Sequence, residues 1–158
     1  MIKMKDDKQD NSGVITLPPL IYLAFLIVSL ILHLLLPINP LSNVLLQFGL
    51  GLPLIGIGFL VSIWAVKTLR RGGATEKVYE PTAKIVVNGP YRFTRNPIYL
   101  SFTSIYLGLA ISFNSLWPIL LLPLLLLVIQ SGVINREERY LERKFGKEYI
   151  KYKNNVRR

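Results

Sequence analysis

The sequence predicts an all-α integral membrane protein with about four membrane-spanning helices and a cytoplasmic amphipathic C-terminal helix. Hydrophobic residues make up 51% of the 158 residues and charged residues only 18%, against about 25% in an ordinary soluble domain. The charged side chains are confined to three zones, and residues 11–66 and 96–135 contain none. Short turns divide these two uncharged blocks into segments near the length that a helix needs to cross a bilayer.

The first uncharged block breaks at Pro37-Ile38-Asn39-Pro40, a composition typical of a turn. We expect one span at about residues 17–36, beginning behind Pro18-Pro19, because proline is common in the first turn of a helix. A second span is expected at about residues 41–66.

The second uncharged block breaks at Asn114-Ser115 and predicts spans at about residues 98–113 and 116–134. The third span is short for a membrane crossing. Pro118 and Pro123 are expected to kink or loosen the fourth.

All Lys and Arg residues lie on one side of this arrangement, because both turns between paired spans are uncharged. The positive-inside rule therefore predicts that the N- and C-termini and the loop at residues 67–97 are cytoplasmic. Residues 1–16 are expected to be a disordered cytoplasmic lead-in and not a cleaved signal peptide, because no small-residue cleavage site follows the apolar run.

Composition also narrows the chemistry. The chain has no Cys and a single His, which excludes disulfide scaffolds and thiol catalysis and leads us to expect no metal. We expect that histidine, His33, to be a hydrogen-bonded packing residue near the outer end of its span. The net charge of +10 does not predict nucleic-acid binding, because the basic zones adjoin the membrane, where anionic headgroups account for them.

Span two carries Gly49, Gly51, Gly56 and Gly58. Small residues let helices approach closely in lipid, so close packing is favoured over a glycine-lined ligand wall.

Two charged segments have the composition of a functional site. The loop at residues 70–97 is long and combines aromatic and cationic side chains with Gly, Pro and Asn. Its alternative interpretation is a basic loop that binds anionic headgroups.

In the segment at residues 135–152, a helical period puts Glu138 on the apolar stripe, beside Glu137. Glu138 has two interpretations, and the sequence does not decide between them. It is either a functional acid, or it pairs with a nearby arginine and holds the C-terminal segment in place.

The two segments together resemble a known family. Residues 88–99, Asn-Gly-Pro-Tyr-Arg-Phe-Thr-Arg-Asn-Pro-Ile-Tyr, resemble the G-P-Y-x-x-x-R-[HN]-P-x-Y signature of integral-membrane methyltransferases. Residues 137–152 resemble their E-E-x-x-L-x-x-x-F-G-x-x-Y-x-x-Y tail. Over about residues 41–156 the chain is similar to the isoprenylcysteine carboxyl methyltransferase family and, more broadly, to the phospholipid methyltransferases.

The resemblance implies S-adenosyl-L-methionine as cofactor, bound at the cytoplasmic interface within about residues 70–158 of a single domain at residues 17–158. The positions implied to contact the cofactor are Ile85, Val86, Gly89, Pro90, Tyr91, Asn96, Pro97, Ile98, Tyr99 and Glu138. The positions implied to be catalytic are Arg95, Glu137 and Glu138. Arg95 would be a fork for a carboxylate, and the paired acids would orient the cofactor's ammonium or ribose or contact the substrate.

The chain departs from the family pattern in two ways. The best-studied eukaryotic members carry His where this chain has Asn96, which forms hydrogen bonds but does not titrate. They also have more spans, which weakens the case for a prenylated protein as substrate.

The leading hypothesis is methyl transfer to a lipophilic, membrane-embedded acceptor, an isoprenylcysteine-like carboxylate or a lipid headgroup, with membrane lipids as partners. A carboxylate needs no base, whereas an amine needs Glu137 or Glu138 to take its proton, and the scarcity of acids favours the carboxylate. One rival is an NADPH-dependent sterol-type reductase, for whose phosphate pocket Lys77 and Lys84 are poor evidence. The other is a non-catalytic protein that binds anionic lipid.

Overall fold

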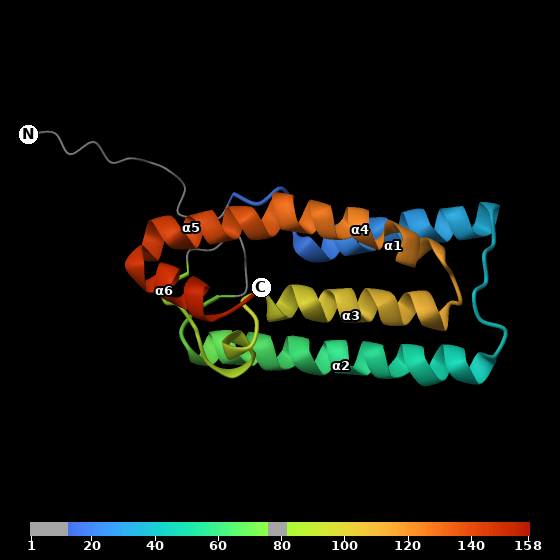
Figure 1. Cartoon of the computed structure of the whole chain (residues 1–158), viewed down its shortest axis with the longest axis horizontal. Coiled ribbons are helices and arrows are strands. Elements are labelled where there is room, and N and C mark those ends of the chain that lie inside the picture. The colour runs from blue at the N-terminus through green and yellow to red at the C-terminus, as the bar shows by residue number, and fades with distance from the viewer. Residues whose placement is uncertain (1–12, 76–81) are drawn as a thin grey trace, which may run out of the picture.

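The computed structural model describes residues 13–75 and 82–158, which form helices and turns with no strand among them (Figure 1). The elements in chain order are α1 (Pro18–Leu35), α2 (Val44–Arg71), the 3-10 turn η1 (Gly89–Arg92), α3 (Pro97–Ser112), α4 (Trp117–Ile129), the π turn η2 (Gln130–Ile134), α5 (Asn135–Phe145) and α6 (Lys147–Asn155). The all-helical prediction is confirmed for the described residues.

Three helices in the described part of the chain are long and apolar enough to cross a membrane. They are α1, α2 and the helix that runs without interruption from Trp117 to Phe145. The apolar part of the last helix ends at Ile134, so α5, which is rich in charge, lies beyond it. The helix α3 is apolar but has only 16 residues. The integral-membrane prediction therefore holds, while the predicted third span, at residues 98–113, falls on a helix shorter than the other three.

The helix boundaries differ from the prediction at the charged end. The helix α2 continues past residue 66 to Arg71, because no breaker precedes Gly72-Gly73. The predicted single C-terminal amphipathic helix is wrong. Gly146 has φ +53, a backbone conformation that L side chains disfavour, and it divides the segment into α5 and α6. The chain then folds back, so that α6 lies beside α5 (Figure 1).

Two of the four glycines in α2 allow close packing against α3. A Cβ on Gly58 would lie 2.8 Å from the carbonyl oxygen of Ser101, and one on Gly51 would lie 2.7 Å from that of Gly108. A Cβ on Gly49 or Gly56 would meet nothing within 4 Å. Gly51 and Gly58 therefore confirm the packing interpretation, because only glycine lets the two backbones come this close.

The remaining core joins α1 and α4 to α3. Tyr22 of α1 packs edge to face against Tyr106 of α3, with ring centroids 6.2 Å apart, and bonds Oγ1 of Thr103 at 2.9 Å. Leu125 of α4 is fully buried against this cluster. The polar edges of these rings are satisfied inside the bundle, as buried tyrosines require.

At the uncharged end, side chains connect the two turns. Asn114 has φ +51, and its side chain both accepts from the backbone nitrogen of Leu41 (2.8 Å) and donates to the oxygen of Leu41 (2.7 Å). Trp117 donates to the carbonyl of Leu36 at 2.7 Å. The Nδ1 atom of His33 is buried without a partner among the described residues, so the hydrogen bond expected for this histidine is not seen at that atom.

Part of the expected disordered segment packs on the helices. Val14 is buried, the nitrogen of Ile15 donates to Gly132 at 3.3 Å, and Arg136 donates to the carbonyl of Gly13 at 2.8 Å. Residues 1–12 of that segment lie outside the described residues.

Candidate functional site

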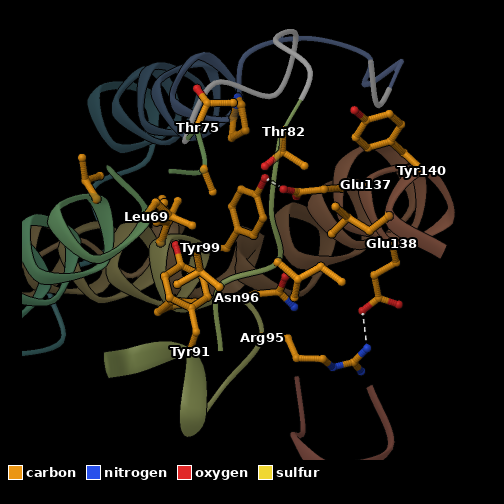
Figure 2. Close-up of a pocket in the computed structure, with 18 of the residues that line it drawn as sticks. Leu69, Thr75, Thr82, Tyr91, Arg95, Asn96, Tyr99, Glu137, Glu138 and Tyr140 are labelled. Carbon is orange, nitrogen blue, oxygen red and sulfur yellow. Dashed lines mark hydrogen bonds and ion pairs between the residues drawn. The ribbon is translucent and has the colours of Figure 1, made fainter. Parts of the chain in front are cut away.

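A cavity of about 300 Å³ lies at the charged end of the helices. Most of the sequence-predicted site residues line it, namely Ile85, Val86, Tyr91, Arg95, Asn96, Pro97, Ile98, Tyr99, Glu137 and Glu138. They come from the loop before α3, from the start of α3 and from α5. Figure 2 shows Tyr99 extending between the loop and α5. The fold thus brings together two motifs that are about 40 residues apart in the chain.

Gly89 and Pro90 do not line this cavity. Gly89 has φ +58 and faces α2, where an added Cβ would lie 2.8 Å from Oγ1 of Thr68. Pro90 is buried in the turn η1. Both residues belong to the turn that carries Tyr91 to the cavity wall, and their implied contact with a cofactor stays a prediction.

Glu137 is hydrogen-bonded across the cavity. The hydroxyl of Tyr99 donates to its Oε2 at 2.8 Å (Figure 2). Burial raises the pKa of Glu137, the hydrogen bond from Tyr99 offsets part of that rise, and the neighbouring charge of Glu138 adds to it. The result is a carboxyl group whose proton affinity is higher than usual and whose partner comes from another helix.

Glu138 has the opposite environment. Nη1 of Arg95 lies 2.9 Å from its Oε1, Arg158 bonds both of its oxygens at 3.0 and 2.7 Å, and Nζ of Lys153 lies 3.7 Å from Oε2. Burial raises the pKa of Glu138, but the bond from Arg158 and the charges of Arg95, Arg158 and Lys153 outweigh it and lower the pKa below its usual range. The pairing interpretation of Glu138 is therefore the one that the geometry supports.

One of these ion pairs engages the guanidinium of Arg95, the residue expected to bind a carboxylate. Its side chain is 9% exposed and is engaged by Glu138, so it is not an unoccupied fork facing the cavity. Nε and Nη1 of Arg95 have no partner of hydrogen-bond geometry among the described residues, and neither has the buried Nδ2 atom of the neighbouring Asn96, which has no ion pair either. A buried amide nitrogen without an acceptor is costly unless a ligand satisfies it.

Two tyrosines of α6 close the cavity on the side of the tail. Tyr152 donates to the backbone oxygen of Tyr91 at 2.7 Å and packs edge to face with Tyr149, with ring centroids 6.0 Å apart. Burial raises the pKa of Tyr152 to about 12, so its hydroxyl stays protonated and can donate. The tail motif therefore holds the loop motif through its side chains.

Part of the cavity wall was not predicted. The start of α1 and parts of α2 and α3 contribute a surface that is apolar except for Ser62, made by Leu17, Pro18, Pro19, Ser62, Val66, Leu69 and Phe102. Pro18-Pro19 carries a local signal only for the start of a helix, and nothing in the sequence links it to residues 120 positions away. The role of Arg158 was also not predicted, because one arginine in a basic C-terminal segment carries no sequence pattern that indicates its partner. Of the two lysines considered for a phosphate pocket, Lys84 lines the cavity and Lys77 lies outside the described residues.

No cluster of three or more His, Cys, Asp or Glu suited to a metal occurs within residues 13–75 and 82–158. The fold is that of an integral membrane protein whose apolar helices have, at their charged end, a cavity lined by apolar side chains and by Glu137 and Glu138. The family model for phospholipid methyltransferase matches residues 46–148. The chain therefore belongs to the phospholipid methyltransferase family, as its two motifs predicted, and is a membrane methyltransferase. No curated protein and no solved structure matches the chain significantly.

Proposed function

We propose that this chain is an S-adenosyl-L-methionine-dependent methyltransferase that acts on a lipophilic acceptor at the cytoplasmic face of the membrane. One observation carries the proposal. A single cavity is lined on one side by apolar side chains of α1 and α2 and on the other by Glu137, Tyr99 and Asn96. Such a cavity suits a reaction between a polar cofactor and a substrate whose tail stays in lipid.

The side chains present fit the cofactor. Its carboxylate or adenine ring needs a hydrogen-bond donor, which the side-chain amide of Asn96 offers, because its Nδ2 atom has no partner among the described residues. The apolar groups of Ile85, Val86 and Ile98 and the ring of Tyr91 suit an adenosine. When bound, the cofactor supplies an electrophilic methyl group, and the protein's task is to position the acceptor and exclude water.

The geometry favours an amine over a carboxylate as acceptor, the reverse of the preference drawn from the sequence. A carboxylate acceptor would need a cation, and of the two cations among the described residues that line the cavity Arg95 is already paired with Glu138, which leaves the exposed Lys84. A lipid ammonium must lose a proton before its nitrogen can attack a methyl group. Glu137 has a raised pKa and lines the cavity, which makes it a better proton acceptor than an ordinary carboxylate. We therefore propose the amine of a phospholipid headgroup as the acceptor.

The membrane orientation is part of the proposal. We assign α3 as a fourth span, since it is apolar and packs along α2, and an even number of spans puts both termini on one side. The positive-inside rule makes that side cytoplasmic. The absence of cysteine permits a direct test with single cysteines introduced at Lys84, Lys147 or Ile38. In right-side-out cells, a membrane-impermeant thiol reagent should label only the cysteine at residue 38.

The function is tested by incubating the purified protein with radiolabelled S-adenosyl-L-methionine and vesicles containing phosphatidylethanolamine, or separately with a farnesylcysteine. We expect label in the phospholipid. Glu137→Gln should lower turnover about a hundredfold, the lower range for loss of a general base, while Glu148→Gln at an exposed position on α6 should not. Label only in the farnesylcysteine would overturn the amine assignment. Consumption of NADPH without methyl transfer would make the protein a reductase.

A further inference from the structure

The chain after α6 lies along the polar wall of the cavity. Val156 leaves the helix with extended backbone, and the backbone nitrogen of Arg95 then donates to the carbonyl of Arg157 at 2.9 Å. One residue later, the guanidinium of Arg158 reaches Glu138. Residues 156–158 therefore join the turn before α3 to α5, two segments that are otherwise distant in sequence.

The contact between Arg158 and Glu138 is bidentate. Nε lies 3.0 Å from Oε1 and Nη2 lies 2.7 Å from Oε2, and Nη2 also lies 3.2 Å from Oδ1 of Asn135. A planar guanidinium that binds both carboxylate oxygens fixes the rotation of the carboxylate as well as its position. Oε1 of Glu138 is the same atom that pairs with Arg95.

The exposed fractions of the three side chains indicate which of them holds the others in place. The side chains of Glu138 and Arg95 are 6% and 9% exposed, whereas that of Arg158 is 41% exposed. Separating Glu138 from Arg95 would leave two buried charges without a partner, which is costly. The relative position of these two groups therefore depends on Arg158, which holds the carboxylate of Glu138 from the exposed side. Arg95 precedes Asn96, which lines the cavity and whose Nδ2 atom is buried without a partner among the described residues, and a rotation at Arg95 would displace that side chain.

We propose that Arg158 is a positioning residue for the methyltransferase site. It fixes Glu138, Glu138 fixes Arg95, and the carbonyl of Arg157 fixes the backbone of Arg95, so that the turn carrying Asn96 is held against the cavity. The adjacent acids then have separate roles: Glu138 is the anchor of the tail, and Glu137 remains for the ligand. This inference rests on the proposed function, because it takes the cavity as the cofactor site.

The first part of the test needs no ligand. Hydrogen–deuterium exchange of the detergent-purified full chain is compared for the parent, Arg158→Gln, Arg158→Lys and Arg143→Gln, the last an exposed arginine of α5. Arg158→Gln should speed exchange in the segment at residues 88–96, which contains the Arg95 amide. Arg158→Lys should have a smaller effect, because it keeps the charge and loses the fork. Arg143→Gln should match the parent.

The second part measures affinity for S-adenosylhomocysteine by calorimetry. Arg158→Gln should weaken binding about tenfold, the effect of one lost charge-assisted hydrogen bond, with Arg158→Lys intermediate and Arg143→Gln unchanged. The bond from Arg158 also lowers the pKa of Glu138, so Arg158→Gln should lose affinity on acidification at a higher pH than the parent does. A purely structural contact would not move that pH.

Each other result overturns one identifiable claim. If Arg158→Gln matches Arg143→Gln in exchange, the tail does not hold the turn. If exchange rises but affinity and its pH dependence stay as in the parent, Arg158 has no positioning role. If the parent itself fails to bind S-adenosylhomocysteine, the proposed function fails, and the exchange data still decide whether the tail holds the turn.

Discussion

The hydroxyl of Tyr99, in the first turn of α3, donates a 2.8 Å hydrogen bond to Glu137 in α5, joining the two halves of the site across the cavity. Because the bond stabilises the ionised carboxylate, it opposes the effect of burial on the pKa of Glu137. Tyr99 thus sets how readily Glu137 accepts a proton. The acid alone would be held in its neutral form more strongly.

Tyr99→Phe removes that bond, so the pKa of Glu137 should rise further. If Glu137 acts as the base, it becomes protonated at a higher pH than in the parent, and the acidic limb of the pH–rate profile should move to higher pH with the plateau largely retained. Tyr140→Phe is the matched control, since Tyr140 also lines the cavity. An acidic limb that stays in place in Tyr99→Phe would remove Glu137 from the proton transfer.

The two adjacent acids should affect stability with opposite signs as pH changes. The pKa of Glu138 is lowered, so its ionised form stabilises the fold above the unfolded value of about 4.5, and this contribution is lost as the pH falls below 4.5. The pKa of Glu137 is raised, so its ionisation destabilises the fold above its folded pKa, and that cost is relieved as the pH falls toward 4.5.

Thermal unfolding in detergent across this pH range measures both effects. Glu137→Gln should raise the melting temperature at neutral pH relative to the parent. Glu138→Gln should lower it, because Arg95 and Arg158 lose their carboxylate, and should flatten the loss below pH 4.5. Shifts of the same sign in both variants would contradict the division of roles.

Close packing of α2 on α3 predicts a contrast between Gly56 and Gly58, which are two residues apart in α2. Gly58→Ala would put a methyl group 2.8 Å from the oxygen of Ser101 and should destabilise the protein by about 1–3 kcal/mol. Gly56→Ala meets open space and should be neutral or slightly stabilising, since alanine is the better helix former. Unfolding of the two variants in the same detergent gives the comparison, and equal stabilities would contradict the packing.

The turns at the uncharged end predict a second contrast. Asn114→Gly loses both hydrogen bonds to Leu41 but tolerates the positive φ, and should cost about 2 kcal/mol. Asn114→Ala loses the same bonds and adds the strain of that backbone conformation, for about 1 kcal/mol more. Affinity for S-adenosylhomocysteine in the folded variants should stay unchanged because the turns lie far from the cavity. Equal stabilities of the two variants would show that the backbone conformation relaxes.

Local signals predicted much of the fold. Proline and asparagine mark both turns, and blocks without charge mark the apolar helices, so the boundaries of α1 and α3 fall within a residue or two of the prediction. The division at Gly146 was missed because the apolar stripe continues on both sides of it, and periodicity alone does not report a positive φ.

The sequence predicted which residues form the two motifs, but it did not predict all of the contacts within the site. Spacing shows which residues belong to a motif, and both motifs do meet at one cavity. It does not show which partner a charged group takes. The pairing of Arg95 with Glu138, and the contribution of Pro18 and Arg158, depend on contacts between segments far apart in the chain, so they require the folded structure.

The claim that the cavity at the charged end holds S-adenosyl-L-methionine is tested most directly by calorimetric titration of the parent and of Tyr91→Ala with S-adenosylhomocysteine, with NADPH in parallel. We expect saturable binding of S-adenosylhomocysteine alone, weakened about tenfold or more in Tyr91→Ala by the loss of aromatic stacking on the base. Binding of NADPH, absence of S-adenosylhomocysteine binding, or equal affinity in the two proteins would contradict the assignment.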